Sequence, residues 1–122
     1  MNDDYRTADE LKYFGSDLNK WINKNCTKDM TVINIDVAQY KRGISIIRLI
    51  ESKHENETMS DSQRELLEKL ARLHDTLEVF TVRGNVPYLT VRITNMKTKE
   101  QKTVDAFQLK DFLEFKTIFD NL

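Results

Sequence analysis

The sequence predicts an α+β domain in which a small antiparallel sheet, made of two hairpins, packs against three helices. Three observations predict this class. Apolar residues recur at helical spacing in three segments, and β-branched residues alternate with polar ones in others. The chain holds only three Gly and one Pro, which favours long regular elements. Its length of 122 residues predicts a single domain over residues 1–122.

The first helix is expected at residues 7–24, where Thr7 and Glu10 form a capping-box pattern. Gly15 weakens its apolar face, and two short helices are the alternative. A second helix begins at Ser60 or Asp61 and carries the strongest signal in the chain, a heptad-like row. The row is Leu66, Leu70, Leu73, Leu77 and Phe80. A last helix is expected from Phe107 to the end of the chain, with Leu109, Phe112, Leu113 and Phe119 at helical spacing.

Residues 31–50 support two interpretations. Alternation of Ile33, Ile35 and Val37 with polar residues, followed by the turn sequence YKRG and the run ISIIRLI, predicts a hairpin. A helix from Asp36 to Lys53 is the competing interpretation, but a central Gly43 and the density of Ile argue against it. We favour the hairpin.

Later in the chain, residues 78–84 (EVFTVRG) suggest a strand, and residues 88–106 suggest a second hairpin. In its first strand, Leu89, Val91 and Ile93 are expected to point inward. The helices are expected to cover one face of the sheet. Dimerisation or binding of a partner would then use the other face or the leucine-rich second helix.

Composition excludes several classes of protein. With 19 basic and 20 acidic side chains, the chain lacks the basic excess typical of a dedicated nucleic-acid binder. A single cysteine, Cys26, excludes an intrachain disulfide and a thiolate zinc site. No signal peptide and no apolar run long enough for a membrane span is visible, so we expect a cytoplasmic protein without a membrane partner.

No chemical motif stands out, and we therefore expect no catalytic residues, no metal site, no cofactor and no small-molecule substrate. His54 and His74 lack ligand spacing, no carboxylate pair with matching geometry is evident, and the three Gly are too isolated to cradle a phosphate. A small enzyme is the third and least favoured interpretation of function.

The leading interpretation is a small non-enzymatic interaction protein that binds and modulates another macromolecule. Its size and type are typical of accessory proteins of phages and mobile elements, which often inhibit a host enzyme and include inhibitors of defence nucleases. The partner would be such a host enzyme, or a second copy in a homodimer. Exposed aromatics beside basic residues are common contact points. The candidate partner-binding residues are Tyr13, Trp21, Tyr40, Lys41 and Arg42.

The alternative is a small DNA-binding regulator that uses the 7–24 helical segment and the 88–106 hairpin. Its candidate contacts are Lys20, Lys24, Arg92, Lys97, Lys99 and Lys102. The hairpin lysines have a second explanation, since lysine also keeps an edge strand soluble and unpaired. We favour that explanation over phosphate binding.

The start of the chain also resembles excisionase-type helix-turn-helix regulators over about 20 residues. The residues that carry the resemblance are Thr7, Ala8, Asp9, Glu10, Leu11 and Gly15. Ser16 and Asp17 depart from the pattern, because an apolar residue usually follows the turn glycine. The resemblance implies a DNA-reading helix in the segment SDLNKWINK.

Overall fold

The computed structural model describes residues 17–27, 29 and 31–122, which belong to two compact units, residues 1–34 and 35–122. In the first unit, helix α2 (Asp17–Asn25) lies within the segment predicted to be helical, and residues 7–16 of that prediction lie outside the described residues. None of the residues of α2 is buried, and the side chain of Asn19 donates a hydrogen bond to that of Asn34. A single domain over residues 1–122 stays a prediction.

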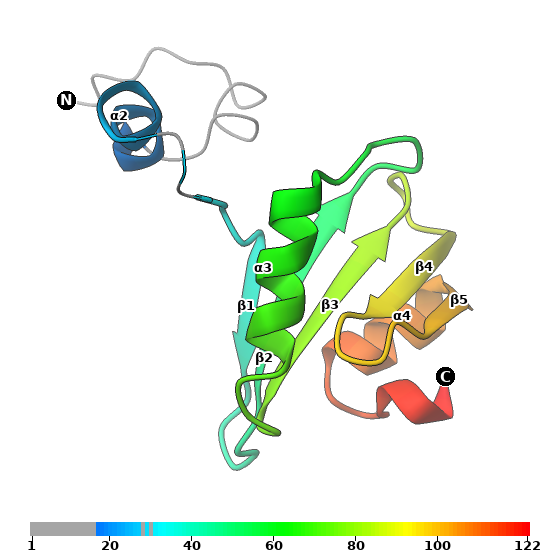
Figure 1. Ribbon diagram of the computed structural model, residues 1–122. Coiled ribbons are helices and arrows are strands. Elements are labelled where there is room, and N and C mark those ends of the chain that lie inside the picture. The colour runs from blue at the N-terminus through cyan, green and yellow to red at the C-terminus, as the bar shows by residue number, and fades with distance from the viewer. Residues whose placement is uncertain (1–16, 28, 30) are drawn as a thin grey trace, which may run out of the picture. The chain divides into compact units, whose positions relative to one another are not determined.

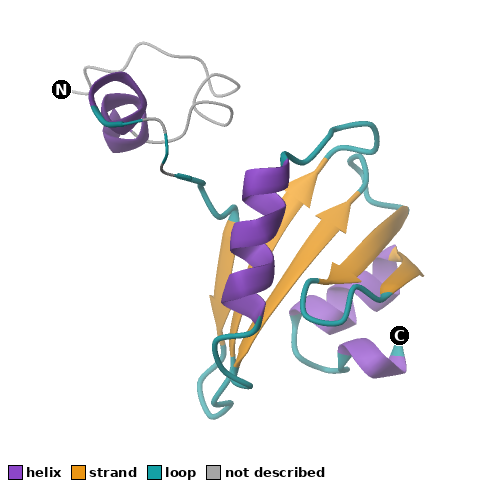
Figure 2. Cartoon of the chain, in the orientation of Figure 1, coloured by secondary structure: helices purple, strands orange, loops and turns teal. Residues whose placement is uncertain are grey.

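The second unit is built on one five-stranded sheet with the strand order β1-β2-β3-β4-β5 (Figures 1 and 2). The strands are β1 (Val37–Tyr40), β2 (Ile47–Lys53), β3 (Leu77–Arg83), β4 (Thr90–Asn95) and β5 (Gln101–Asp105). All neighbours are antiparallel except β2 and β3, which run parallel. A parallel pair needs a crossover connection, which helix α3 (Asp61–Ala71) supplies. The α+β class is confirmed, but the sheet is single and mixed and does not consist of two separate antiparallel hairpins.

Helices lie on both faces of this sheet, contrary to the expectation that they cover one face (Figure 1). Side chains alternate along β3, so Val79 and Thr81 share one face while Phe80 and Val82 share the other. All four are buried. Helix α3 packs on the first face, and helix α4 (Ala106–Leu113) with the 3-10 helix η1 (Phe119–Asn121) packs on the second. The main core on the α4 side comprises Ile50, Phe80, Val82, Val91, Ile93, Val104, Leu109, Phe112 and Phe119.

The hairpin interpretation of residues 31–50 is confirmed, and the competing helix is wrong. Its strands, β1 and β2, begin later than the alternation suggested, so Ile33 and Ile35 precede the sheet. Gly43 has a φ of 87° in the connecting turn, which is a conformation that glycine adopts without a Cβ clash. The second hairpin, β4–β5, is also confirmed. Val91 and Ile93 are buried as expected, but Leu89 is 69% exposed.

The predicted second helix is too long at its C-terminal end. Helix α3 ends at Ala71, and both Leu77 and Phe80 belong to β3. A turn separates the two elements, in which the Nδ1 atom of His74 accepts a hydrogen bond of 3.1 Å from the backbone N–H of Thr76. The apolar row was misleading because a strand buried on both faces carries apolar residues without strict alternation.

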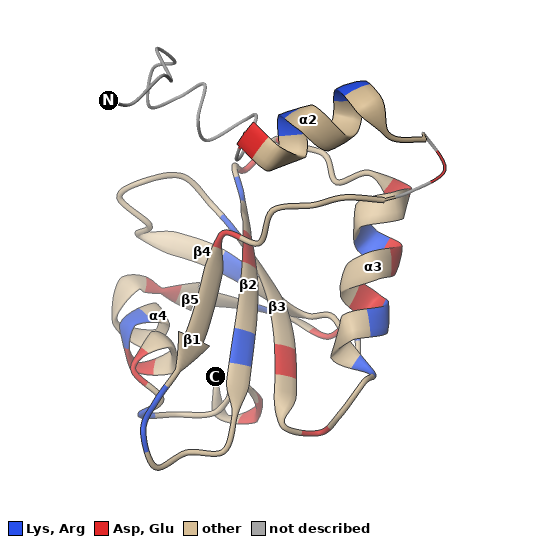
Figure 3. Cartoon of the chain, turned by 90° about the vertical axis from the view of Figure 1, so that its left-hand side faces the viewer, with Lys and Arg blue, Asp and Glu red and all other residues tan. Residues whose placement is uncertain are grey.

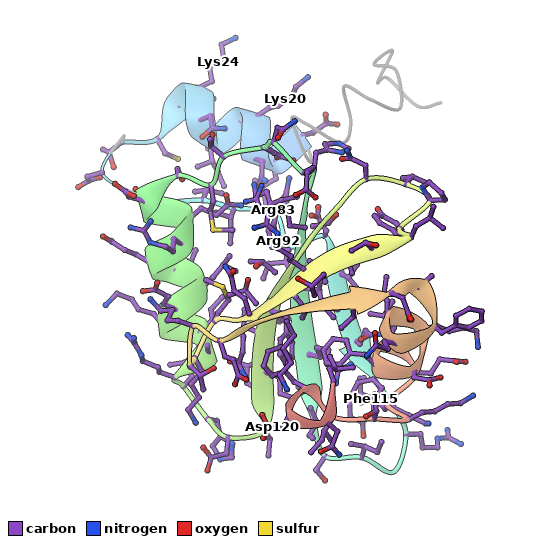
Figure 4. All side chains as sticks on the ribbon, turned by 90° about the vertical axis from the view of Figure 1, so that its right-hand side faces the viewer. Lys20, Lys24, Arg83, Arg92, Phe115 and Asp120 are labelled. Atoms are coloured by element: carbon purple, nitrogen blue, oxygen red, sulfur yellow. The ribbon has the colours of Figure 1, made fainter. Side chains whose placement is uncertain are left out.

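The last helix is likewise interrupted. Helix α4 ends at Leu113, Phe115 has a φ of 60°, and only the short η1 follows (Figure 4). Side chains of the first hairpin donate to the last carbonyl groups of α4, and the Phe112 carbonyl also accepts from the Phe115 backbone N–H at 3.1 Å. Arg48 Nη1 donates to the Phe112 carbonyl at 2.6 Å, and Gln39 Nε2 donates to the Leu113 carbonyl at 2.9 Å. Among the described residues, no helix has the length and apolar character needed to cross a bilayer.

Candidate functional site

The first hairpin brings Asp36 and Glu51 together, although they are separated by 15 positions. Val37 pairs with Ile50, so the same antiparallel register places Asp36, one residue before β1, opposite Glu51 of β2. Residues opposite each other in an antiparallel pair project from the same face. The Oδ2 atom of Asp36 accepts a hydrogen bond of 2.8 Å from the backbone N–H of Ser52, which fixes the carboxylate beside β2.

Glu51 is unusual for a carboxylate. Its residue surface is only 5% exposed, and its Oε2 atom has no hydrogen-bond partner among the described residues. Burial, followed by repulsion from the Asp36 carboxylate and a side-chain hydrogen bond with it, raises the pKa of Glu51 from 4.5 to about 7, against the opposing effect of Lys53. Buried polar atoms in native proteins are nearly always satisfied, so an unpartnered oxygen requires an explanation. Asp36 is exposed, and the pair is therefore open to solvent at one side.

Lys53 is the basic member of the site. It lies two residues after Glu51 on the same face of β2 and is 7% exposed. Its Nζ atom is 3.8 Å from Glu51 Oε1 and 3.4 Å from Glu57 Oε2. Burial raises the pKa of Glu57, but the His54 backbone N–H and the Lys53 ammonium outweigh it, so the net shift is downward. Glu57 is thus an ionised anchor that holds the ammonium group beside Glu51.

Two arginines continue the positive charge across the sheet from Lys53. Arg83 of β3 is the register partner of Lys53, and Arg92 of β4 is the partner of Arg83. Figure 4 shows the two arginines side by side. Arg83 Nη1 donates to the backbone carbonyls of His54, at 2.9 Å, and of Glu57, and so holds the loop that follows β2. Figure 3 shows charged positions within the central strands β2 and β3 themselves.

The atoms with which this site could bind a metal ion are carboxylate oxygens. Among the described residues, no cluster of three or more His, Cys, Asp or Glu side chains is suited to hold a metal ion. Asp36 and Glu51 provide two carboxylates. Mg²⁺ needs fewer protein ligands than zinc or calcium. It is commonly held by one or two carboxylates and completes its octahedron with water and substrate phosphates. The donor set and the unpartnered Glu51 oxygen fit that ion.

In comparisons with models of protein families, with curated proteins and with solved structures, nothing matches this chain. The assignment of function therefore depends on the site alone.

The lysines proposed for DNA binding in the second hairpin all have partners within the protein. Lys97 Nζ is 3.2 Å from Asp75, and Lys99 pairs with Glu68. Lys102 is on the α4 face, where its Nζ donates at 2.9 Å to the carbonyls of Phe119 and Asp120. Arg92 of β4 is also paired, since its Nη2 atom is 3.1 Å from Glu55 Oε1. Lys20 and Lys24 project from α2 in the other unit (Figure 4).

The candidate partner-binding residues are divided between the units. Tyr13 lies outside the described residues, and Trp21 of α2 is 59% exposed. Tyr40 ends β1 and is 69% exposed. Next to it, the Nζ atom of Lys41 donates to the Glu114 carbonyl at 3.1 Å, while Arg42 is exposed in the turn.

Sequence reasoning missed Asp36, Glu51 and Lys53. The sequence did contain a signal for Glu51 and Lys53. Glu51 and Lys53 interrupt the end of an apolar run two residues apart, so both must face the same side of a central strand. Charged residues at such positions are rare unless paired or functional. Asp36 gave no signal of its own, because its relation to Glu51 depends on strand register.

Proposed function

We propose that this protein is a Mg²⁺-dependent hydrolase of phosphodiester bonds, with Asp36 and Glu51 as metal ligands and Lys53 as the residue that binds the reacting phosphate. The proposal departs from the sequence-based expectation of a non-enzymatic protein without a metal site. The observation that carries it is the buried Glu51 carboxylate, which has one unpartnered oxygen beside a second carboxylate and an ammonium group.

A bound cation would offset two unfavourable features of the site, namely the repulsion between the two carboxylates and the desolvation of Glu51. Two neighbouring carboxylates repel each other, and Glu51 is also desolvated. A divalent ion would supply the missing partner of Oε2 and remove the repulsion. With only two protein ligands, the ion would keep coordination positions for water and for phosphate oxygens.

The nature of the other side chains indicates phosphate chemistry. Lysine is a common phosphate ligand, and Lys53 is held beside the carboxylates by Glu57. Magnesium would polarise the phosphate and acidify a bound water. In the reaction, the water oxygen bonds to phosphorus while a phosphorus–oxygen ester bond breaks. The attacking water would release one proton to solvent, and the leaving alkoxide would take up one proton from solvent. Lys53 would offset the negative charge that develops on the phosphate oxygens.

The test compares metal binding and hydrolysis in Asp36→Asn, Lys53→Met and the control Asp75→Asn, an exposed carboxylate paired with Lys97. Mn²⁺ binding is measured by calorimetry, and hydrolysis is measured on bis(4-nitrophenyl) phosphate and on an oligonucleotide with Mg²⁺. Outer-shell partners of metal ligands contribute about 10- to 100-fold, so loss of a ligand in Asp36→Asn is expected to reduce both readouts at least ~100-fold. Lys53→Met is expected to abolish hydrolysis while retaining Mn²⁺ binding, and Asp75→Asn to behave as the wild type.

Two outcomes contradict the proposal. One is a wild-type protein that binds no Mn²⁺ at millimolar concentration. The other is hydrolysis that persists in Asp36→Asn, which would trace it to a contaminating enzyme or to other residues.

We propose binding of a second copy of the chain as a further function, on the basis of one exposed apolar pair. Tyr40 and Ile47 are opposite each other in the β1–β2 pairing and are 69% and 50% exposed. They belong to the edge strand β1 and its neighbour, and an exposed edge can pair with another strand. Inhibition of a host enzyme through this surface stays a prediction from the sequence.

A further inference from the structure

We propose that Arg83 is a positioning residue for the reaction of the carboxylate site. It fixes the loop that follows β2 and, through Glu57 of that loop, the ammonium group of Lys53. This role rests on the proposed function, because Lys53 is the residue that binds the reacting phosphate there. Loss of Arg83 is then expected to impair the reaction although Arg83 is neither a metal ligand nor a phosphate ligand.

The ends of two parallel strands bring Arg83 and Lys53 together. Lys53 is the last residue of β2, Arg83 is the last residue of β3, and the two are register partners. Because the strands are parallel, both residues lie at the same edge of the sheet. The backbone N–H of Gly84 donates to the Lys53 carbonyl at 3.0 Å, so the pairing continues past the end of β3. The position of the Lys53 backbone is therefore set by β3 and the residue that follows it.

The loop between β2 and α3 is bound to the end of β3 and to the β3–β4 connection, which lies beside it (Figure 1). Its first four residues form a turn, in which the backbone N–H of Glu57 donates to the His54 carbonyl at 3.1 Å. Arg83 Nη1 donates to the carbonyls of His54, at 2.9 Å, and of Glu57. The backbone N–H of Glu55 donates to Asn85 Oδ1 at 3.1 Å. One guanidinium thus binds both ends of the turn and fixes its shape.

Glu57 connects this turn to Lys53. Its Oε1 atom accepts a hydrogen bond of 2.9 Å from the His54 backbone N–H, and its Oε2 atom is 3.4 Å from Lys53 Nζ. Both carboxylate oxygens have partners, so the orientation of the carboxylate depends on the shape of the turn. In the proposed reaction Glu51 is a metal ligand. Glu57 is then the carboxylate that remains to hold the Lys53 ammonium in place.

The contacts of Arg83 favour a positioning role over direct phosphate binding. Its Nη1 atom is shared between the carbonyls of His54 and Glu57, and turning it toward a ligand would give up both bonds. Lys53 differs in this respect, because an ammonium group carries three N–H donors. It can therefore keep its contact with Glu57 and still donate to a phosphate oxygen.

The experiment uses Arg83→Met and Glu57→Gln, singly and together. Arg64→Met and Glu114→Gln are matched controls, because both residues belong to exposed ion pairs, at α3 and at the end of α4. For each protein, kcat and KM are measured on bis(4-nitrophenyl) phosphate with Mg²⁺, and Mn²⁺ binding is measured by calorimetry. Urea unfolding measures stability. Mass spectrometry after treatment with acetic anhydride measures the rate at which Lys53 is acetylated.

Each single variant is expected to lower kcat about 100-fold, because a displacement of about 1 Å in a positioned group can have an effect of that size. KM and Mn²⁺ binding should stay as in the wild type, since the metal ligands are intact and the lost interaction belongs to the transition state. The double variant should be no slower than the slower single variant, because both substitutions act through Lys53.

Acetylation of Lys53 should become at least ~10-fold faster in all three variants, because the charged hydrogen bond that holds its ammonium group is lost. Both controls should match the wild type in every measurement. Additive losses of kcat in the double variant would assign Arg83 a direct contact with the phosphate and overturn the positioning role. Wild-type kcat in Glu57→Gln would also overturn it, and this variant decides the question if Arg83→Met does not fold.

Failure of the proposed function gives a different result. If the wild type neither binds Mn²⁺ nor hydrolyses the diester, but acetylation of Lys53 becomes faster in Arg83→Met and Glu57→Gln, the positioning of Lys53 stands and the hydrolase proposal fails. If the wild type hydrolyses the diester and neither variant changes kcat or acetylation, the hydrolase proposal stands and the positioning role fails.

Discussion

The variant Glu51→Gln is expected to be more stable than the wild type at pH 8 without Mg²⁺, and to be inactive. Burial and Asp36 raise the pKa of Glu51 from 4.5 to about 7 in the folded protein. Between these pH values the folded state holds a proton that the unfolded state releases. The wild type therefore loses stability as pH rises from about 4.5 to about 7, and the loss persists at higher pH. At 1.36 kcal/mol per pKa unit, the loss amounts to as much as about 3 kcal/mol.

Urea unfolding between pH 4 and pH 8 measures this effect. Glutamine is neutral at every pH, so the pH dependence of the free energy of unfolding should become flatter in Glu51→Gln, and the two proteins should agree near pH 4. Glu65→Gln, at an exposed position of α3, is the control. A variant that is less stable than the wild type at pH 8 would contradict the idea that the buried carboxylate is a cost to the fold.

Magnesium is expected to reverse the difference. A ligand that binds only the folded state stabilises it by about 2.7 kcal/mol at 100 times its dissociation constant. Mg²⁺ should raise the stability of the wild type at pH 8 and leave Glu51→Gln unchanged. Equal stabilisation of both proteins would mean that the ion binds elsewhere.

Loss of Arg48 is expected to have a comparable effect on stability, in the opposite direction. Arg48 is 2% exposed, and its guanidinium lies 3.9 Å from the ring centroid of Phe112 and 4.1 Å from that of Phe115. It donates to Glu78 at 3.2 Å and to the Phe112 carbonyl at 2.6 Å. Arg48→Met removes the donor to Glu78, which is 32% exposed, while the Phe112 carbonyl keeps the Phe115 backbone N–H at 3.1 Å. Loss of the charged hydrogen bonds of this buried guanidinium is expected to cost about 2 kcal/mol.

Urea unfolding at pH 7 tests this expectation. Lys41→Met is the matched control, because Lys41 also donates to a carbonyl near the end of α4 but is exposed. A change within about 0.5 kcal/mol is expected for the control, as for most surface substitutions. A cost below 1 kcal/mol for Arg48→Met would show that water replaces the guanidinium and that the aromatic contacts contribute little.

The sequence predicted much of the secondary structure but not the way in which the strands combine. Both hairpins, the first part of the second helix and the strand at residues 78–84 are confirmed by the structure. The parallel pairing of β2 with β3 was missed because Leu77 and Phe80 continue the helical row of α3. Their membership of β3 depends on burial from both sides, which requires α4 to be in place.

The candidate site was harder to predict because it depends on register. Glu51 and Lys53 are near neighbours in the chain and could have been noticed as charges within an apolar strand. Asp36 joins them only through the pairing of Val37 with Ile50. Local patterns carry no information about such a pairing, so the sequence did not bring these three residues together.

The hairpin that unites Asp36 with Glu51 has a consequence for how this protein can tolerate insertions. Additional residues between Tyr40 and Ile47 would lengthen only the turn, and a doubling of its length costs about 0.6 kcal/mol in loop entropy. One residue inserted between Asp36 and Val37, or between Ile50 and Glu51, would instead send one carboxylate to the opposite side of the sheet. Natural variation in length should therefore accumulate in the turn and be absent from the strand ends.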